Sequence, residues 1–212
     1  PVDPRLITEG SMAVARAAME SGVARKPIED WKAHRQHLRE LMGQETKFTQ
    51  NLYDTARMNP KRVVFAEGTH PTMLEAAVKA KAEGICHPVL LGNEDQIRHM
   101  AEEMDLKISD IEILNLRNDD QTDRRRRYAE ILANKMQRKG YTLQEAIDKM
   151  YERNYFGMMM VETGEADAFI TGLYTKYSNT IKVANEVIGI REGYNHFATM
   201  HLVNSKKGIY FI

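Results

Sequence analysis

The residues best suited to chemistry lie between Thr171 and Lys182, where the chain reads Thr-Gly-Leu-Tyr-Thr-Lys-Tyr-Ser-Asn-Thr-Ile-Lys. This stretch carries hydroxyls, an amide and two lysines, and it runs into a predicted helix. Such groups beside a helix N-terminus, where backbone N–H groups are unpaired, suit a phosphate or a carboxylate. The candidate ligand-binding residues are Thr171, Thr175, Lys176, Ser178, Asn179, Thr180 and Lys182.

The same stretch also has a purely structural interpretation. Ser178 could simply cap the helix, and the two lysines could be solvated. The glycine spacing of a P-loop is absent. Composition alone therefore favours neither interpretation over the other.

Other groups are weaker candidates. Gly68-Thr69-His70 follows a predicted strand, so its amides could face an anion, although a plain turn is the simpler interpretation. The basic run Arg124–Arg127 has acidic neighbours and is interpreted as a solvated helix face. Cys86 follows a helix C-terminus, which does not stabilise a thiolate, so it is predicted to be a packed thiol. We predict no catalytic residue and no metal site in this chain.

The elements that must position these residues follow an α/β alternation. Short apolar strands are predicted at 62–67, 87–91 and 111–116, with helices at 73–83, 93–104, 120–139 and 143–150. Residues 155–189 read as helix, turn, buried strand, polar loop and second helix. Short strands separated by single helices predict a parallel sheet flanked by helices in three layers. Ligands gather at the carboxyl ends of such strands, and Thr171–Lys182 follows one of them.

The two ends of the chain do not follow this alternation of strands and helices. Residues 28–58 have helical periodicity, as one long helix or as two helices broken near Gly43. A hairpin turn is predicted at Ser205–Gly208. The predicted organisation is residues 1–27, a helical connector at 28–58, the α/β domain at 59–190, and the truncated start of a second, β-containing lobe at 191–212.

Composition limits the partners and the compartment. The 212 residues include 42% hydrophobic residues, and 30 basic residues balance 30 acidic ones. No global positive field is available, so we expect neither nucleic acid nor a membrane as a partner. No apolar run of about 18 residues is present. The single cysteine suits a reducing, cytoplasmic location. The chain starts without methionine and stops within an apolar strand pattern, so we expect a piece of a longer polypeptide.

From Asn59 on, the chain resembles the phosphate acetyl/butyryltransferase family. The resemblance is carried by Phe65-Ala-Glu-Gly68, Glu83-Gly-Ile85, Pro88-Val-Leu-Leu-Gly92, Tyr128-Ala-Glu-Ile-Leu132, Lys139-Gly140, Tyr155-Phe-Gly-Met-Met-Met160, Gly164-Glu-Ala-Asp-Ala168 and Ser178-Asn-Thr180. The amino-acid sequence of residues 154–168 and 172–180 is similar to that of the transferase-like C-terminal region of large bacterial NADP-dependent malic enzymes. Residues 3–24 resemble the last stretch of the malic enzyme domain, which would make 1–27 its remnant.

The resemblance implies two α/β subdomains, a cleft for a coenzyme A thioester, and a homo-oligomer of at least two chains. Two arginines of active transferases align with Met136 and Lys182, and an aspartate aligns with Asn179. Lysine keeps a point charge but not a bidentate guanidinium. The family's catalytic serine and aspartate would lie beyond Ile212. The resemblance therefore implies a poor transferase.

We accordingly expect a non-catalytic region that senses acetyl-CoA, or a related anionic metabolite, and helps its parent to oligomerise. The parent would oxidise malate to pyruvate and CO2 with NADP and Mg or Mn, cofactors that this region would not itself bind. Two alternatives stay open. One is a phosphate acyltransferase acting on acetyl-CoA and phosphate, and the other is a purely structural dimerisation module.

Overall fold

A computed structural model describes residues 9–41, 47–205 and 208–212 of the chain. The described residues divide into two compact units. One unit is residues 55–198, and the other comprises the described parts of 1–54 and 199–212. The candidate site lies wholly within the first unit.

The unit of residues 55–198 contains a four-stranded parallel sheet. Its strands are β1 (Lys61–Phe65), β2 (Cys86–Leu91), β3 (Glu112–Leu114) and β4 (Ala168–Ile170). They lie in the order β3-β2-β1-β4, and every neighbouring pair is parallel. At the centre of β1, Val64 lies opposite Val89 on one side and Phe169 on the other. The parallel sheet predicted from the alternating strands and helices is confirmed.

Six helices accompany this sheet, and their ends follow the local sequence. They are α4 (Pro71–Ala82), α5 (Glu94–Glu103), α6 (Thr122–Met136), α7 (Leu143–Lys149), α8 (Arg153–Glu162) and α9 (Tyr177–Val187). Short 3-10 turns, Asp119–Gln121 and Gln137–Lys139, flank α6. Asn93 Oδ1 accepts a hydrogen bond from the Gln96 N–H at 3.0 Å and so caps α5. Pro71 occupies the first position of α4, where its missing N–H is harmless.

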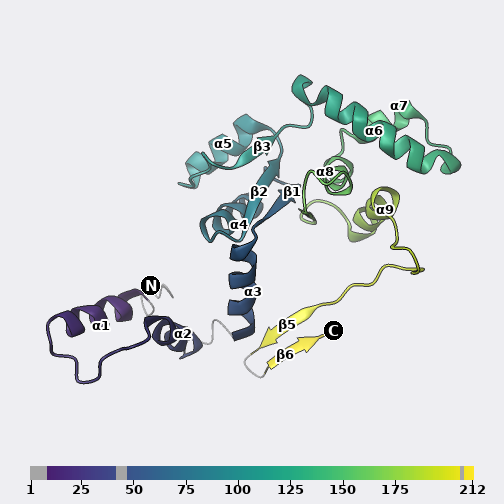
Figure 1. Cartoon of the computed structure of the whole chain (residues 1–212). Coiled ribbons are helices and arrows are strands. Elements are labelled where there is room, and N and C mark those ends of the chain that lie inside the picture. The colour runs from purple at the N-terminus through teal and green to yellow at the C-terminus, as the bar shows by residue number, and fades with distance from the viewer. Residues whose placement is uncertain (1–8, 42–46, 206–207) are drawn as a thin grey trace. The chain divides into compact units, whose positions relative to one another are not determined.

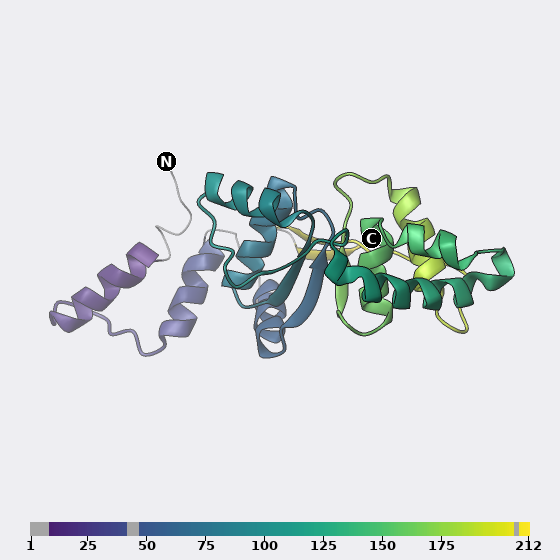
Figure 2. The same ribbon diagram turned by 90° about the horizontal axis from the view of Figure 1, so that it is seen from above.

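The alternation of side chains along the strands builds one apolar core on each face of the sheet. Phe65 and Leu90 pack with α4 and α5 on one face. Val64 and Leu91 point the other way and pack with α6, α8 and α9. Figures 1 and 2 both show α4 and α5 on one side of the strands and α6 to α9 on the other. The unit is therefore a three-layer α/β/α structure, as predicted.

Helix α8 lies directly against the sheet. Met158, Met159 and Met160 are buried and belong to the apolar core. Gly157 faces Phe169 of β4 so closely that a Cβ at this position would lie 2.6 Å from Phe169 Cδ2 and 3.3 Å from Leu91 Cδ1. The absence of a side chain at Gly157 is what allows the helix backbone to approach the sheet.

Replacing Gly157 with alanine is expected to lower the free energy of unfolding by about 1–3 kcal/mol, because the added methyl group forces the Phe169 ring or the helix to move. Chemical denaturation followed by circular dichroism would measure the change. Gly10→Ala is the matched control, since a Cβ there meets nothing within 4 Å. Equal stability of the two variants would contradict the close packing of α8.

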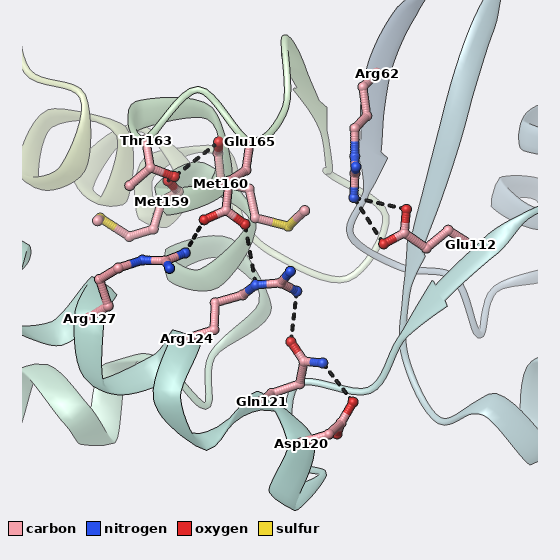
Figure 3. Close-up of polar contacts among 10 residues, drawn as sticks. All are labelled: Arg62, Glu112, Asp120, Gln121, Arg124, Arg127, Met159, Met160, Thr163 and Glu165. Carbon is pink, nitrogen blue, oxygen red and sulfur yellow. Dashed lines mark hydrogen bonds and ion pairs between the residues drawn. The ribbon is translucent and has the colours of Figure 1, made fainter.

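The basic run Arg124–Arg127 is not the uniform solvated face that its charge pattern suggests. Arg124 and Arg127 reach from α6 to Glu165, the residue before the buried Ala166, and Arg124 Nε lies 3.2 Å from Glu165 Oε2 (Figure 3). Arg126 and Arg127 fit the prediction, since both have exposed side chains, and Arg126 is paired to Glu130. Arg125 is buried, and for it the prediction is wrong. Its carbonyl partners, described below, explain why a charge can be buried there.

Cys86 begins β2 and is buried, in agreement with the prediction of a packed thiol. Burial raises the pKa of this thiol, and the nearby charge of Lys81 offsets only part of the rise. Because the thiolate is the reactive form, Cys86 is chemically quiet at neutral pH.

The second unit contains the remaining elements. Its helices are α1 (Ser11–Glu20), α2 (Trp31–Leu41) and the start of α3 (Lys47–Met58), and its strands are β5 (Leu202–Ser205) and β6 (Gly208–Phe211). The helical stretch predicted at 28–58 thus contains two helices, although Gly43 lies outside the described residues. The predicted hairpin is confirmed, since β5 and β6 pair antiparallel. The boundaries 1–27, 28–58, 59–190 and 191–212 stay predictions. Among the described residues, no helix is long and apolar enough to cross a membrane.

Candidate anion-binding site

The site lies at the point where the strand order reverses. The chain moves from β1 to β2 and β3 on one side and then returns to place β4 on the other side of β1. In open α/β sheets, ligands bind beyond the carboxyl ends of the strands at such a point. Glu67 follows β1 and Thr171 follows β4. The Thr171 hydroxyl and the Gly172 N–H donate to Glu67 Oε1 at 2.9 and 3.1 Å.

A pocket of about 470 Å³ opens at this position. It is formed by the loops after β1, β3 and β4 and by the beginnings of α8 and α9. Its lining residues are Glu67, Arg117, Lys149, Tyr151, Glu152, Arg153, Asn154, Tyr155, Tyr174, Thr175, Asn179, Lys182 and Val183.

Two helix N-termini contribute to the pocket. Arg153 and Asn154 belong to the first turn of α8, and Asn179 to the first turn of α9. Neither helix has a side chain hydrogen-bonded at its N-terminus within the described residues. First-turn N–H groups and the positive end of the helix dipole both favour an anion. Two helices that begin at one pocket add their effects.

The lining side chains make the pocket positive. Four are basic, namely Arg117, Lys149, Arg153 and Lys182, whereas Glu67 and Glu152 are the acidic ones. Arg153 stacks over the Tyr174 ring at 5.5 Å, and Lys149 lies 4.6 Å from the centre of the Tyr155 ring. Arg117 and Lys182 form no ion pair with any residue that the structure describes. Their charges are therefore available to a ligand.

A second pocket of about 330 Å³ adjoins the first and shares Arg117, Tyr151 and Arg153 with it. Its other lining residues are mainly uncharged and polar: Thr69, Gly92, Asn93, Gln96, Asn115 and Leu116. Together the two pockets follow the carboxyl ends of the strands, with a cationic half at β1 and β4 and an amide-rich half at β2 and β3.

Arg125 fixes the segment that carries Arg117. Its Nη1 donates to the backbone oxygens of Leu116 and Asn118 at 2.6 and 2.7 Å, on either side of Arg117. Its Nη2 donates to Thr122 Oγ1 at 2.8 Å. The guanidinium also lies 4.7 Å from the centre of the Tyr151 ring, which lines both pockets. Arg125 is therefore a positioning residue behind the site.

Glu186 anchors helix α9. It is buried, and its Oε2 accepts hydrogen bonds from the hydroxyls of Tyr155 and Tyr141 at 2.5 and 2.8 Å. Burial alone would raise the pKa of Glu186, but these two bonds and the charges of Lys182 and Lys149 outweigh it and lower the pKa. Burial, followed by the bond to Glu186, raises the pKa of both tyrosines. One turn before Glu186, Lys182 is thereby held at the pocket.

A comparison with protein families decides where the chain belongs. The family model described as "Phosphate acetyl/butaryl transferase" matches residues 47–212. The chain belongs to the phosphate acetyl/butaryl transferase family. Two curated relatives are similar to nearly the whole chain. The NADP-dependent malic enzyme of Rhizobium meliloti (strain 1021) is 38% identical over 198 residues, which are 92% of this chain and 26% of that protein. The NADP-dependent malic enzyme of Salmonella typhimurium (strain LT2) is 34% identical over 216 residues, which are 100% of this chain and 28% of that protein.

The chain therefore spans little more than a quarter of the length of these malic enzymes. Its fold is also that of a solved phosphotransacetylase. EutD phosphotransacetylase from Staphylococcus aureus superposes with a TM-score of 0.66 at 22% identity, over 76% of this chain and 49% of that one. This likeness supports the α/β architecture derived above.

The structure places the predicted residues of this family member in three different situations. Thr175, Asn179 and Lys182 line the pocket. The Thr171 hydroxyl is occupied by Glu67 and also lies 3.0 Å from Asn154 Oδ1. Lys176, Ser178 and Thr180 line none of the pockets described above.

The last three residues differ in detail. Lys176 is the N-cap position of α9, so Ser178 is the second helical residue and does not cap the helix. The interpretation of Ser178 as a simple cap is therefore wrong. The Thr180 hydroxyl is buried and has no hydrogen-bond partner among the described residues.

Two other predictions can be placed. The N–H groups of Gly68 and His70 bond to Leu91 O and Glu67 O at 3.1 and 2.9 Å, which makes this segment a plain turn. Met136, the position aligned with a family arginine, is buried in the core with α6 and lines none of the pockets described above. Among the described residues, no group of three or more His, Cys, Asp or Glu side chains could hold a metal ion.

Sequence reasoning missed most of the charged lining. Glu67, Arg117, Lys149, Arg153 and Asn154 were not singled out, although all five line the pocket. The signal was available for two of them, because Glu67 ends a predicted strand and Arg117 follows one, as Thr171 does. Applying the strand-end rule to every strand would have found them.

Proposed function

We propose that this region binds the phosphoryl groups of an acyl-coenzyme A, with acetyl-CoA as the first candidate, and thereby regulates malate oxidation in a longer NADP-dependent malic enzyme. The region itself is not catalytic in this proposal. NADP and the divalent metal belong to the malate-oxidising portion of that longer protein. The proposal includes association of at least two chains, which analytical ultracentrifugation of the intact enzyme would test.

One observation carries the proposal. Four basic side chains and the N-termini of α8 and α9 converge on one pocket at the strand-order reversal. The excess of positive over negative side chains suits a ligand with several negative charges. The similarity to malic enzymes supports the regulatory context, because a region with an anion pocket attached to an oxidoreductase can report on a metabolite. For this the ligand must bind two states of the enzyme differently.

Lys182→Met is the variant that tests binding. In the intact malic enzyme, acetyl-CoA is expected to inhibit malate oxidation, and Lys182→Met is expected to raise the half-inhibiting concentration roughly tenfold, because a charge-assisted bond to the ligand is lost. Titration of acetyl-CoA against the rate of NADPH formation measures both effects.

Lys79→Met is the matched control, since Lys79 lies on α4 with an exposed side chain and lines none of the pockets described above. It should leave the titration unchanged. An intact enzyme whose rate and malate affinity ignore acetyl-CoA would rule out the sensing role, although not a role in assembly. A region that serves assembly alone would change the oligomer on deletion without removing any response to acetyl-CoA.

Membership of the phosphate acetyl/butaryl transferase family favours a second candidate, a region that still transfers an acyl group between phosphate and coenzyme A. Phosphate-dependent release of free thiol from acetyl-CoA would reveal it. If the intact protein released thiol in this way and Lys182→Met abolished the release, the region would be a transferase and the proposed sensor role would be wrong. Inhibition of malate oxidation without thiol release would support the sensor.

A further inference from the structure

Glu67 is a buried acid inside a pocket that otherwise attracts anions. Only 2% of its surface is exposed. One carboxylate oxygen, Oε1, accepts hydrogen bonds from the Thr171 hydroxyl and the Gly172 N–H. The other, Oε2, is buried and has no hydrogen-bond partner among the described residues. A buried acceptor without a donor is unfavourable and requires an explanation.

The structural role of Glu67 does not explain why Oε2 is buried without a donor. That role is to join the loops after β1 and β4, and it uses a single oxygen. A glutamine would supply the same acceptor to Thr171 and Gly172 without burying a charge. None of the four basic side chains of the pocket forms an ion pair with Glu67 in the described part of the chain. The second oxygen is therefore left for something that enters the pocket.

The chemistry of that ligand follows from the charges. Basic side chains and two helix N-termini draw an anion into the pocket, where a carboxylate would repel it unless a proton lies between them. Hydrogen phosphate carries such a proton at neutral pH, and a phosphate monoester retains one near its second pKa of about 6. Sulfate and the diphosphate bridge of a coenzyme carry none.

We infer that Glu67 Oε2 accepts a hydrogen bond from the P–OH group of a phosphate or phosphate monoester, and that Glu67 makes the pocket reject oxyanions without a proton. The inference rests on the proposed function, since it assumes that the pocket binds a phosphoryl group. It goes further by naming the kind of phosphoryl group and the residue that selects it. Selection arises because sulfate would set an unprotonated oxygen against the carboxylate.

Isothermal titration calorimetry of the 212-residue chain with sodium phosphate and sodium sulfate, at equal ionic strength and pH 7, tests the inference. The native chain is expected to bind phosphate at least about 100-fold more tightly than sulfate, since like-charge contact costs several kcal/mol. In Glu67→Gln the ratio should fall to about threefold or less, because the amide can donate to sulfate. The matched control is Glu152→Gln, which removes the other acid of the pocket and should shift both affinities equally.

The outcomes separate the inference from the function on which it rests. If the native chain binds neither anion, the proposed phosphoryl site is wrong and the inference with it. If the native chain binds both anions equally, only the role of Glu67 is wrong, and this result does not depend on whether the variant folds. Unchanged selectivity in a folded Glu67→Gln chain also overturns that role. Displacement of phosphate by coenzyme A but not by dephospho-coenzyme A identifies a phosphate monoester as the natural group, and displacement by neither identifies free phosphate.

Discussion

Arg125→Met should lower the free energy of unfolding by about 3 kcal/mol, because it removes a buried guanidinium and leaves the Leu116 carbonyl without a donor among the described residues, while the Asn118 carbonyl keeps only its bond from the Gln121 N–H. The backbone oxygens of Leu116 and Asn118 would lose bonds of 2.6 and 2.7 Å. Each buried acceptor left without a partner costs about 1–3 kcal/mol. Urea denaturation followed by circular dichroism measures the loss.

The neighbouring residue supplies the control for this change. Arg126→Met removes a guanidinium from an exposed i,i+4 pair with Glu130 and should change stability by no more than about 0.5 kcal/mol. Arg125→Lys keeps the charge but lacks the second nitrogen that bonds Thr122 Oγ1, so its stability should lie between the native chain and Arg125→Met. If Arg125→Met proved as harmless as Arg126→Met, the carbonyl bonds would not fix the segment that carries Arg117.

Glu186→Leu should have a comparable effect, with a loss of about 2–4 kcal/mol. It removes the shared acceptor of two tyrosines, so the buried Tyr155 hydroxyl loses its carboxylate partner. Glu186→Gln keeps an acceptor but loses the charge, and charge-assisted bonds are about twice as strong as neutral ones, so its loss should be roughly half. The exposed Glu130→Gln is the control. Thermal unfolding ranks the variants, and a Glu186→Leu chain as stable as the control would contradict the anchoring of α9.

Glu186 also makes the stability of the folded chain depend on pH, and the direction of its pKa shift fixes the sign of that dependence. The folded pKa of Glu186 lies below its ordinary value of 4.5. The unfolded chain therefore binds this proton at a higher pH than the folded chain, and stability falls with pH below about 4.5. The difference in stability between the native chain and Glu186→Gln should be constant above this range and shrink as pH falls through the lowered folded pKa. A difference that persisted unchanged to strongly acidic pH would contradict the ionised form assigned to Glu186.

Much of the fold could be predicted because local signals agreed with one another. Pro71, Asn93 and Gly84 mark helix starts and ends through properties of single residues, and the structure places helix boundaries at or beside each of them. The alternation of short strands with single helices predicted the parallel sheet flanked by helices. What sequence reasoning could not supply was tertiary: Arg125 is buried only because the carbonyls of Leu116 and Asn118 meet it in space.

The site was harder to predict for a related reason. The Thr171–Lys182 stretch could be identified because many polar residues lie close together in the sequence. Three of its seven candidate residues line the pocket. Arg117 and Arg153 are isolated cations in the sequence, 36 residues apart, and they meet only when β3 and the start of α8 reach the same end of the sheet. Glu67 was predicted only as the last residue of a buried strand, and its burial in a pocket lined by cations is what indicates its chemistry.

Because the Cys86 thiol is unreactive, this chain is well suited to site-specific labelling at an introduced cysteine. Cys86 is the single cysteine in the sequence, and it is buried with a raised pKa. A cysteine introduced at Tyr177, which begins α9 and has 69% of its surface exposed, would therefore be the one thiol to react with a maleimide dye. Fluorescence from that helix end would then report occupancy of the neighbouring pocket in real time.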